Sequence, residues 1–212
     1  MSTKSERNEQ AKARARALGA RLFAEKGYRE TTTRELASAM DVTNGTFYYY
    51  FSSKEDLLYQ ISLGALLEIT NAVTKALEGE TGIQARIKKL IAAHMTTILE
   101  SPDFHKTSLE LNWRSLSDDR RQEIIEARAA YEALLRGEVR EAQARGYFRA
   151  DTDARILTLL LLNLMNWTIF WYHPGRGLTT ADLIAEIEHL FLDGARVTSS
   201  RRSPKARRPS QP

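Results

Sequence analysis

The chain has 212 residues, a formal net charge of +4 and no cysteine, and 42% of its residues are apolar and 27% charged. That length allows one or two domains with a core that needs no disulfides, and the lack of thiols excludes disulfide frameworks, thiolate zinc sites and cysteine nucleophiles. Four histidines, 11 glycines and 5 prolines are few for this length, which disfavours an imidazole-rich metal site and an all-β fold rich in turns.

The charge is distributed unevenly along the chain. Residues 1–59 carry a net charge of +2, residues 60–197 carry −3, and residues 198–212 carry +5. Basic ends on either side of an acidic middle favour contact with a polyanion such as nucleic acid. The first ten residues are polar and charged, so we expect no secretory signal, no membrane partner and a cytoplasmic protein.

Apolar residues recur three and four positions apart, and two-residue alternation is rare, so the sequence predicts an all-α fold. We expect a first helix over residues 7–27, with Leu18, Leu22 and Phe23 on its inner face. Two short helices follow, which end near residues 40 and 50. Thr32 and Thr43 have the side chains expected of their N-caps.

A long fourth helix is predicted over residues 54–77. Five more are expected over residues 83–100, 103–115, 119–145, 153–172 and 180–197. Residues 198–212 contain five basic side chains and almost no apolar ones. We expect this tail to be disordered and to add non-specific attraction to DNA.

Residues 156–172 are almost uniformly apolar and need separate consideration. The run has 17 residues and contains Asn163 and Asn166, whereas a membrane-spanning helix needs about 20 apolar residues. We therefore expect a buried helix of a soluble protein. A helix that is apolar all round must be covered on more than one side, so it is either central in a bundle or packed against a second subunit.

The two short helices, joined by a tight turn after a longer helix, form a helix-turn-helix pattern. Residues 43–46 place small or hydrogen-bonding side chains at the end of the second helix that would enter the major groove. Phe47 and Phe51 are expected to face inward, and at least two of the three tyrosines at 48–50 to face outward. The alternative is a helical hairpin whose polar residues are solvated and whose tyrosines only pack.

The stretch from Gly27 to Leu58, GYRETTTRELASAMDVTNGTFYYYFSSKEDLL, closely resembles the DNA-binding region of the TetR family of transcriptional repressors. The resemblance implies a helix-turn-helix DNA-binding domain over residues 1–53. A larger helical effector-binding and dimerisation domain would cover residues 54–197. It also implies a homodimer that binds a palindromic operator on double-stranded DNA and is released by a small effector.

Matched position by position, the family pattern implies a backbone contact by Thr33 and a base contact by Arg34. The DNA-binding residues expected from it are Thr33, Arg34, Thr43, Asn44, Gly45, Thr46, Tyr48, Tyr49, Tyr50 and Lys54. Two positions depart from the pattern. Asp41 replaces the usual turn glycine, although aspartate tolerates the left-handed conformation, and Tyr50 replaces a common histidine.

Dimerisation is expected through the last two helices. The final helix carries an apolar stripe at helical spacing, which consists of Leu183, Ile184, Ile187, Leu190 and Phe191. Two such helices from each subunit would form a four-helix contact, and a reader of a two-fold operator needs two-fold symmetry. The alternative is that the stripe packs within its own chain.

The effector site is expected among the large residues of the second domain, since ligand pockets are mostly apolar with a few polar groups. The candidates are Met95, Leu99, Phe104, His105, Leu109, Trp113, Asn163, Trp167, Phe170 and Trp171. The stretches around Trp113 and Trp167 resemble the subgroup of the family that controls fatty-acid or sterol catabolism and is commonly released by acyl-CoA thioesters. Phe170 stands where members often have arginine, which suggests a more apolar or shorter ligand.

Two alternatives to an acyl-CoA-responsive repressor stay open. One is a repressor of an efflux or stress gene that responds to a drug-like hydrophobic molecule, and the other is a helical ligand-binding protein without DNA binding. No catalytic constellation, phosphate-binding glycine loop or HExxH motif is present. We therefore expect no enzyme, no cofactor and no metal.

Overall fold

The computed structural model describes residues 4–196, and every regular element within that range is helical. In chain order these elements are α1 (Lys4–Lys26), α2 (Thr33–Ala39), α3 (Asn44–Tyr50), α4 (Lys54–Leu77), α5 (Ile83–Glu100), α6 (Pro102–Leu109), the 3-10 helix η1 (Leu111–Ser115), α7 (Asp118–Ala144), α8 (Ala154–Trp171) and α9 (Thr180–Ala195). The expected all-α fold is confirmed. The tail predicted over residues 198–212 lies outside the described residues.

The short helices begin where their capping residues predict. The Thr32 side chain accepts a hydrogen bond from the Glu35 amide, and the Glu35 carboxylate accepts one from the Thr32 amide, which makes a complete capping box. Thr43 caps α3 by accepting from the Thr46 amide at 3.1 Å. Asp41, in the turn between the two helices, has a φ of 54°, so it adopts the left-handed conformation expected there.

One expected helix is split in two. The sequence predicts a single helix over residues 103–115, but α6 ends at Leu109, Glu110 is extended, and η1 follows. The physical reason is a tertiary contact, since the Ser108 carbonyl accepts a hydrogen bond from the Arg128 guanidinium of α7. In a continuous helix that carbonyl would accept from the amide of residue 112.

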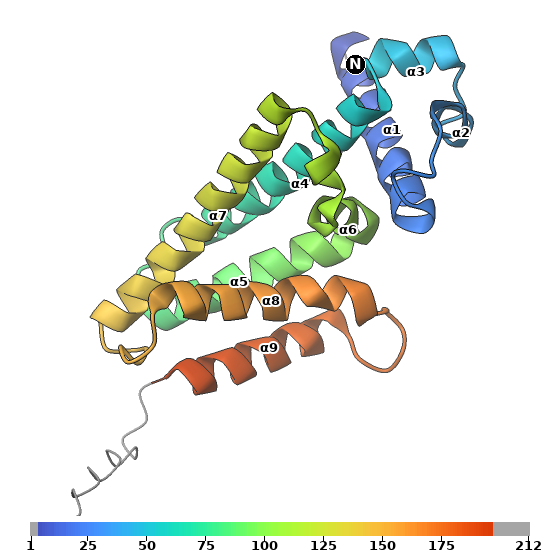
Figure 1. Cartoon of the computed structure of the whole chain (residues 1–212). Coiled ribbons are helices and arrows are strands. Elements are labelled where there is room, and N and C mark those ends of the chain that lie inside the picture. Colours follow the sequence, from blue (N-terminus) through green and yellow to red (C-terminus); the bar gives the residue numbers. More distant parts are fainter. Residues whose placement is uncertain (1–3, 197–212) are drawn as a thin grey trace, which may run out of the picture.

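Figure 1 shows a small head of α1, α2 and α3 at one end of the molecule, from which α4 runs alongside α7. The head packs around Phe23, Leu36, Phe47 and Phe51, which are fully buried. Leu57 of α4 belongs to the same cluster. The first turns of α4 are therefore part of the head, while the rest of this helix belongs to the larger helical body.

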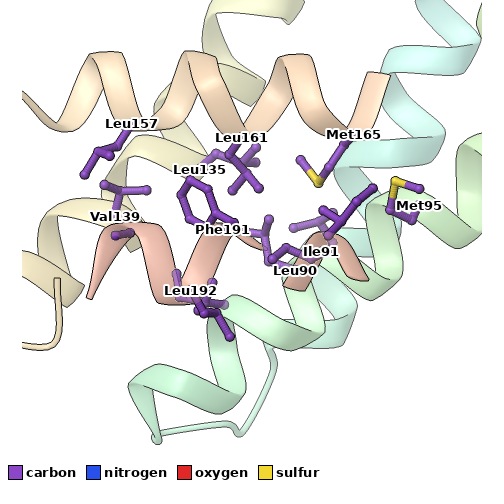
Figure 2. Close-up of a cluster of buried hydrophobic side chains, with 14 of the residues drawn as sticks. Leu90, Ile91, Met95, Leu135, Val139, Leu157, Leu161, Met165, Phe191 and Leu192 are labelled. Carbon is purple, nitrogen blue, oxygen red and sulfur yellow. The ribbon is translucent and has the colours of Figure 1, made fainter. Parts of the chain in front are cut away.

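The body has its own core between α5, α7, α8 and α9. Figure 2 shows side chains from these four helices converging, and the labelled residues are Leu90, Ile91, Met95, Leu135, Val139, Leu157, Leu161, Met165, Phe191 and Leu192. α9 packs against α5 and α8. Helices α5, α7 and α8 of this core also line the cavity described below.

α8 is buried on one face only. It is the one helix in residues 4–196 that is long and apolar enough to cross a membrane, and 39% of it is buried. Leu161 and Met165 are fully buried, whereas Leu160 is 53% and Trp167 64% exposed. The expectation of a buried helix therefore holds for one face, and the other face is apolar and uncovered in the single chain.

Candidate DNA-binding surface and effector cavity

The second short helix, α3, presents its polar residues and two of its three tyrosines away from the head core, while Tyr50 packs against that core. Phe47 and Phe51 are fully buried, as predicted, while Tyr48 is 53% and Tyr49 71% exposed. The side chains of Thr43 and Asn44 are also exposed. Fixing α3 through two buried phenylalanines leaves its outer face free to contact another molecule.

Arg34 of α2 lies beside the start of α3. It lines a shallow hollow together with Ser38, Asp41, Thr43 and Asn44. Arg34 is exposed, and its guanidinium forms no ion pair or hydrogen bond with the described residues. The structure thus brings together one free guanidinium and the polar end of α3, a combination suited to base edges and phosphates.

Lys54 occupies a different position from the other predicted DNA contacts. Its ammonium donates hydrogen bonds to the carbonyl oxygens of Tyr28 and Thr31, both at 2.8 Å, and to that of Arg29 at 3.4 Å. It also lies 4.4 Å from the centre of the Tyr28 ring, and burial lowers its pKa. An ammonium has three protons. Lys54 therefore ties the loop between α1 and α2 to the start of α4, and a phosphate contact by this residue stays a prediction.

A cavity of about 280 Å³ lies in the body, enclosed by α4, α5, α6, α7 and α8. Its apolar walls are formed by Ala65, Leu66, Ile69, Ile98, Leu109 and Leu162. Its polar residues are His94, His105, Ser108, Arg128, Tyr131, Glu132 and Asn166. Because α4 also belongs to the head core, a ligand in this cavity would touch a helix that reaches the predicted DNA-binding surface.

His94 is a neutral, fully paired member of the wall. Its Nδ1 lies 2.6 Å from the Tyr131 hydroxyl and its Nε2 lies 3.0 Å from Oδ1 of Asn166. Because the amide oxygen only accepts, Nε2 carries the proton and Nδ1 accepts from the tyrosine. Burial lowers the pKa of His94 to about 3 and raises that of Tyr131. This network is satisfied without a ligand and orders the α5, α7 and α8 walls.

His105 and Arg128 are less completely paired. Nε2 of His105 is buried and has no hydrogen-bond partner, although it lies 3.4 Å from a carboxylate oxygen of Glu68. Burial lowers the pKa of His105 to about 4, so this contact is not an ion pair at neutral pH. Nε of Arg128 is likewise buried without a partner, while the same guanidinium bonds Ser108 and lies 5.0 Å from the Trp113 ring centre.

The structure brings only part of the predicted effector set to this cavity. His105 and Leu109 line it. Met95 is fully buried in the body core and Leu99 packs against that core. Phe104 lines a separate hollow between α1, α5 and α6, so the cluster expected from the sequence is dispersed.

The aromatic residues of α8 lie on its outer side. The rings of Trp167 and Phe170 are in contact at a tilt of 40°, with their centres 4.9 Å apart, and both residues are exposed. Asn163, Trp167 and Trp171 line an open apolar groove of about 740 Å³ between α8 and α9. Trp113 contacts Arg128 instead, so the sequence-based placement of an effector between Trp113, Trp167 and Phe170 does not correspond to one cavity.

Sequence reasoning missed Arg128, Tyr131 and Glu132 of α7 as lining residues. This helix is rich in arginine and glutamate, and nothing local separates Arg128 from its exposed neighbours. A weak signal existed in the spacing, because residues 128, 131 and 132 share one helix face and 131 is aromatic.

The apolar stripe of α9 packs mainly within its own chain. Leu183, Ile187 and Phe191 are at most 6% exposed, and Ile184 packs against the same core. Only Leu190 of the stripe is largely exposed, at 63%. The prediction that this stripe forms the dimer contact is therefore corrected, because most of the stripe is buried in the core of its own chain. The apolar surface that stays uncovered is the α8 side of the groove.

Both parts of the chain match known protein families. Residues 16–61 match the family described as bacterial regulatory proteins, tetR family, and residues 80–195 match the tetracyclin repressor-like, C-terminal domain. The HTH-type transcriptional repressor KstR2 of Rhodococcus jostii strain RHA1 is 25% identical over 181 residues, which cover 84% of this chain and 87% of that protein.

Solved structures agree. The TetR family transcriptional regulator PfmR from Thermus thermophilus is 31% identical with a TM-score of 0.77, covering 84% of this chain and 97% of that one. The structure of AibR in complex with isovaleryl coenzyme A and operator DNA has a TM-score of 0.76 at 18% identity, covering 85% and 97% of the two chains. The similarity to AibR is a similarity of fold.

Proposed function

Because the chain belongs to the TetR family of bacterial transcriptional repressors, we propose that it binds a palindromic operator as a homodimer and leaves it when a small apolar effector binds. Members of this family are DNA-binding regulators and not enzymes. The observation that carries the proposal is the position of α4. Its first turns lie in the head core and its middle lines the cavity.

DNA binding is supported by the geometry of the head. The exposed Arg34 and Asn44 border one hollow, and Tyr48 and Tyr49 project from the next turns of α3. The N-terminal end of α3 would enter the major groove, with Arg34 on a base edge and the tyrosines on the phosphate backbone. The remaining predicted contacts, Thr33, Thr43, Gly45, Thr46 and Tyr50, belong to the same two helices or their caps.

Release by a ligand follows from the position of α4. A ligand in the cavity would touch Ala65, Leu66 and Ile69, one or more turns after the head-core residue Leu57. Two heads on an operator must lie about one helical turn, roughly 34 Å, apart. A ligand that prefers a tilted α4 changes this spacing and lowers affinity without unfolding the protein.

The effector we propose is a small apolar, acyl-type molecule. The cavity volume of about 280 Å³ lies just below the range for drug-sized ligands, roughly 300–1,000 Å³. It can hold a short acyl group while a coenzyme A portion stays outside. AibR, whose fold is similar, was solved with isovaleryl coenzyme A and operator DNA. A drug-like hydrophobic effector of an efflux or stress gene remains the second candidate.

Replacing Arg34 with alanine should weaken operator binding by about 1–3 kcal/mol and change random-sequence binding little, as expected for a base contact. Lys54→Ala should weaken both equally, because it loosens the loop between α1 and α2 and removes any phosphate contact. Fluorescence anisotropy titrations with the two DNAs measure both effects. Arg140→Ala, an exposed arginine of α7, is the control, and equal losses on both DNAs for Arg34→Ala would contradict base reading.

Acyl-CoA thioesters of graded chain length should dissociate the operator complex in a gel-shift assay, with the shorter chains that fit the cavity most effective. Ala65→Leu adds volume inside the cavity and should raise the concentration needed for release by about tenfold, a loss of about 1.4 kcal/mol in binding. Ala133→Leu, on the exposed side of α7, should not. If no thioester releases DNA while a hydrophobic drug does, the drug-like alternative takes its place.

A further inference from the structure

Two residues that line the cavity, His105 of α6 and Arg128 of α7, carry buried nitrogen atoms without hydrogen-bond partners among the described residues. These atoms are Nε of Arg128 and Nε2 of His105. Nε1 of Trp113, which contacts Arg128 but does not line the cavity, is also buried and unpaired. His105 is 97% buried, as its side chain keeps only 3% exposure. Arginine and tryptophan nitrogens donate and never accept, and a neutral histidine nitrogen can donate.

His105 and Arg128 come from two different helices, α6 and α7, that both line the cavity. His105, Ser108 and Leu109 share a face of α6, since residues three and four apart on a helix are neighbours. The Ser108 carbonyl accepts a hydrogen bond from the Arg128 guanidinium, which ties Arg128 to α6, and both His105 and Arg128 line the cavity. A ligand that enters the cavity therefore meets both side chains.

The charge of Arg128 is not balanced by a carboxylate. Arg128 forms no ion pair, at a distance of 4.0 Å or less, with any residue between 4 and 196. Glu132, one turn along α7, lies 3.4 Å from Arg136 and 3.9 Å from Arg155. Burial lowers the pKa of Arg128, yet an arginine stays charged in proteins. The Trp113 ring offsets part of the cost of burying this charge.

Two carboxyl groups near the cavity bear on which ligand fits. Glu132 is held by its two arginines, and Glu68, beside His105, is half exposed. Burial, followed by the charge of Glu100, raises the pKa of Glu68. Neither carboxylate contacts Arg128, so a ligand anion has room at this guanidinium. A buried cation stabilises an anion far more than a neutral group of the same shape.

We propose that the effector is a small apolar carboxylic acid whose carboxylate is held in the cavity by Arg128, with His105 as a second donor. The inference rests on the cavity's being the effector site. It differs from simple acyl-CoA recognition, because a thioester carbonyl is neutral. A coenzyme A thioester meets this requirement only if its acyl chain carries a free carboxylate in addition to the thioester group.

The test compares matched ligands on the full-length protein. Straight-chain acids from butyrate to decanoate, together with the alcohols and methyl esters of the same chains and their CoA thioesters, are titrated by calorimetry and tryptophan fluorescence. At least one acid should bind about tenfold more tightly than its alcohol and ester, as a charge-assisted hydrogen bond implies. Arg128→Gln should remove this preference, Arg128→Lys should keep much of it, and Arg140→Gln should leave it unchanged.

The outcomes separate this inference from the proposed function. If acid, alcohol and ester of a chain bind equally, or if none of them binds, the carboxylate proposal is wrong. It is also wrong if Arg128→Gln weakens acid and alcohol alike, which would indicate packing only. If CoA thioesters release the operator and the protein does not bind acids more tightly than alcohols or esters, the proposed function is supported and the carboxylate proposal is wrong. Acids that bind through Arg128 without releasing DNA would confirm a carboxylate site in the cavity, but would contradict the claim that the acid is the effector and, with it, the proposed coupling.

Discussion

Replacing Leu160 with glutamate should convert the protein to a monomer and weaken operator binding by about a hundredfold or more, the equivalent of roughly 3 kcal/mol. Leu160 is 53% exposed on the outer face of α8 and lines the apolar groove with Trp167 and Leu190. In a two-fold contact each substitution occurs twice and buries two unpaired carboxylates. A monomer presents one head and reads half of a palindrome.

The measurement is molar mass by light scattering, paired with operator titrations. Leu67→Glu is the matched control, because Leu67 is 50% exposed on α4 and does not line the groove. It should leave mass and affinity unchanged. A dimer that survives Leu160→Glu would place the subunit contact on another surface.

The outer face of α8 is an apolar surface that the single chain leaves uncovered. Ile156, Leu160, Trp167 and Trp171 of α8 are each 47% or more exposed. Contiguous apolar surface of this kind marks an interaction site on a soluble protein. The sequence indicates that residues 156–172 need cover on several sides, and the single chain covers one.

Local rules explain what could be predicted from the sequence. The caps at Thr32 and Thr43 and the left-handed Asp41 depend on neighbouring atoms within four residues, and all three are found in the structure. The inward phenylalanines of α3 follow from helical spacing. These features define the head, so its polar surface could be predicted closely.

Contacts between distant segments explain what could not be predicted. The break between α6 and η1 depends on Arg128, 20 residues beyond the Ser108 carbonyl that it binds. Size alone pointed to Trp167 and Phe170 as pocket residues, yet both lie on the outer side of α8. Periodicity identifies the apolar positions of α9 but does not indicate whether the same chain or a partner covers them.

Lowering the pH from 7 to 5 should reduce the free energy of unfolding by about 3–4 kcal/mol, mostly through His94 and His105. Burial lowers their folded pKa values to about 3 and 4, against about 6.5 in an unfolded chain. Between these values the unfolded state binds protons that the folded state does not, so stability falls as the pH falls. Each histidine contributes about 2 kcal/mol at pH 5, since one pKa unit corresponds to about 1.4 kcal/mol.

Carboxyl groups whose folded pKa is lowered do not produce this slope, because they titrate below the histidines. Hydrogen bonds from Lys26 and Thr32 lower the pKa of Glu35 to about 2, and the raised pKa of Glu68 acts in the opposite direction, because it adds stability as the pH falls. Urea unfolding at a fixed protein concentration, at intervals between pH 7 and 5, therefore isolates the histidines. His94→Gln should flatten the dependence by about half. His189→Gln, on the exposed side of α9, should leave the slope unchanged, and an unaltered slope in His94→Gln would mean that His94 is protonated in the folded protein.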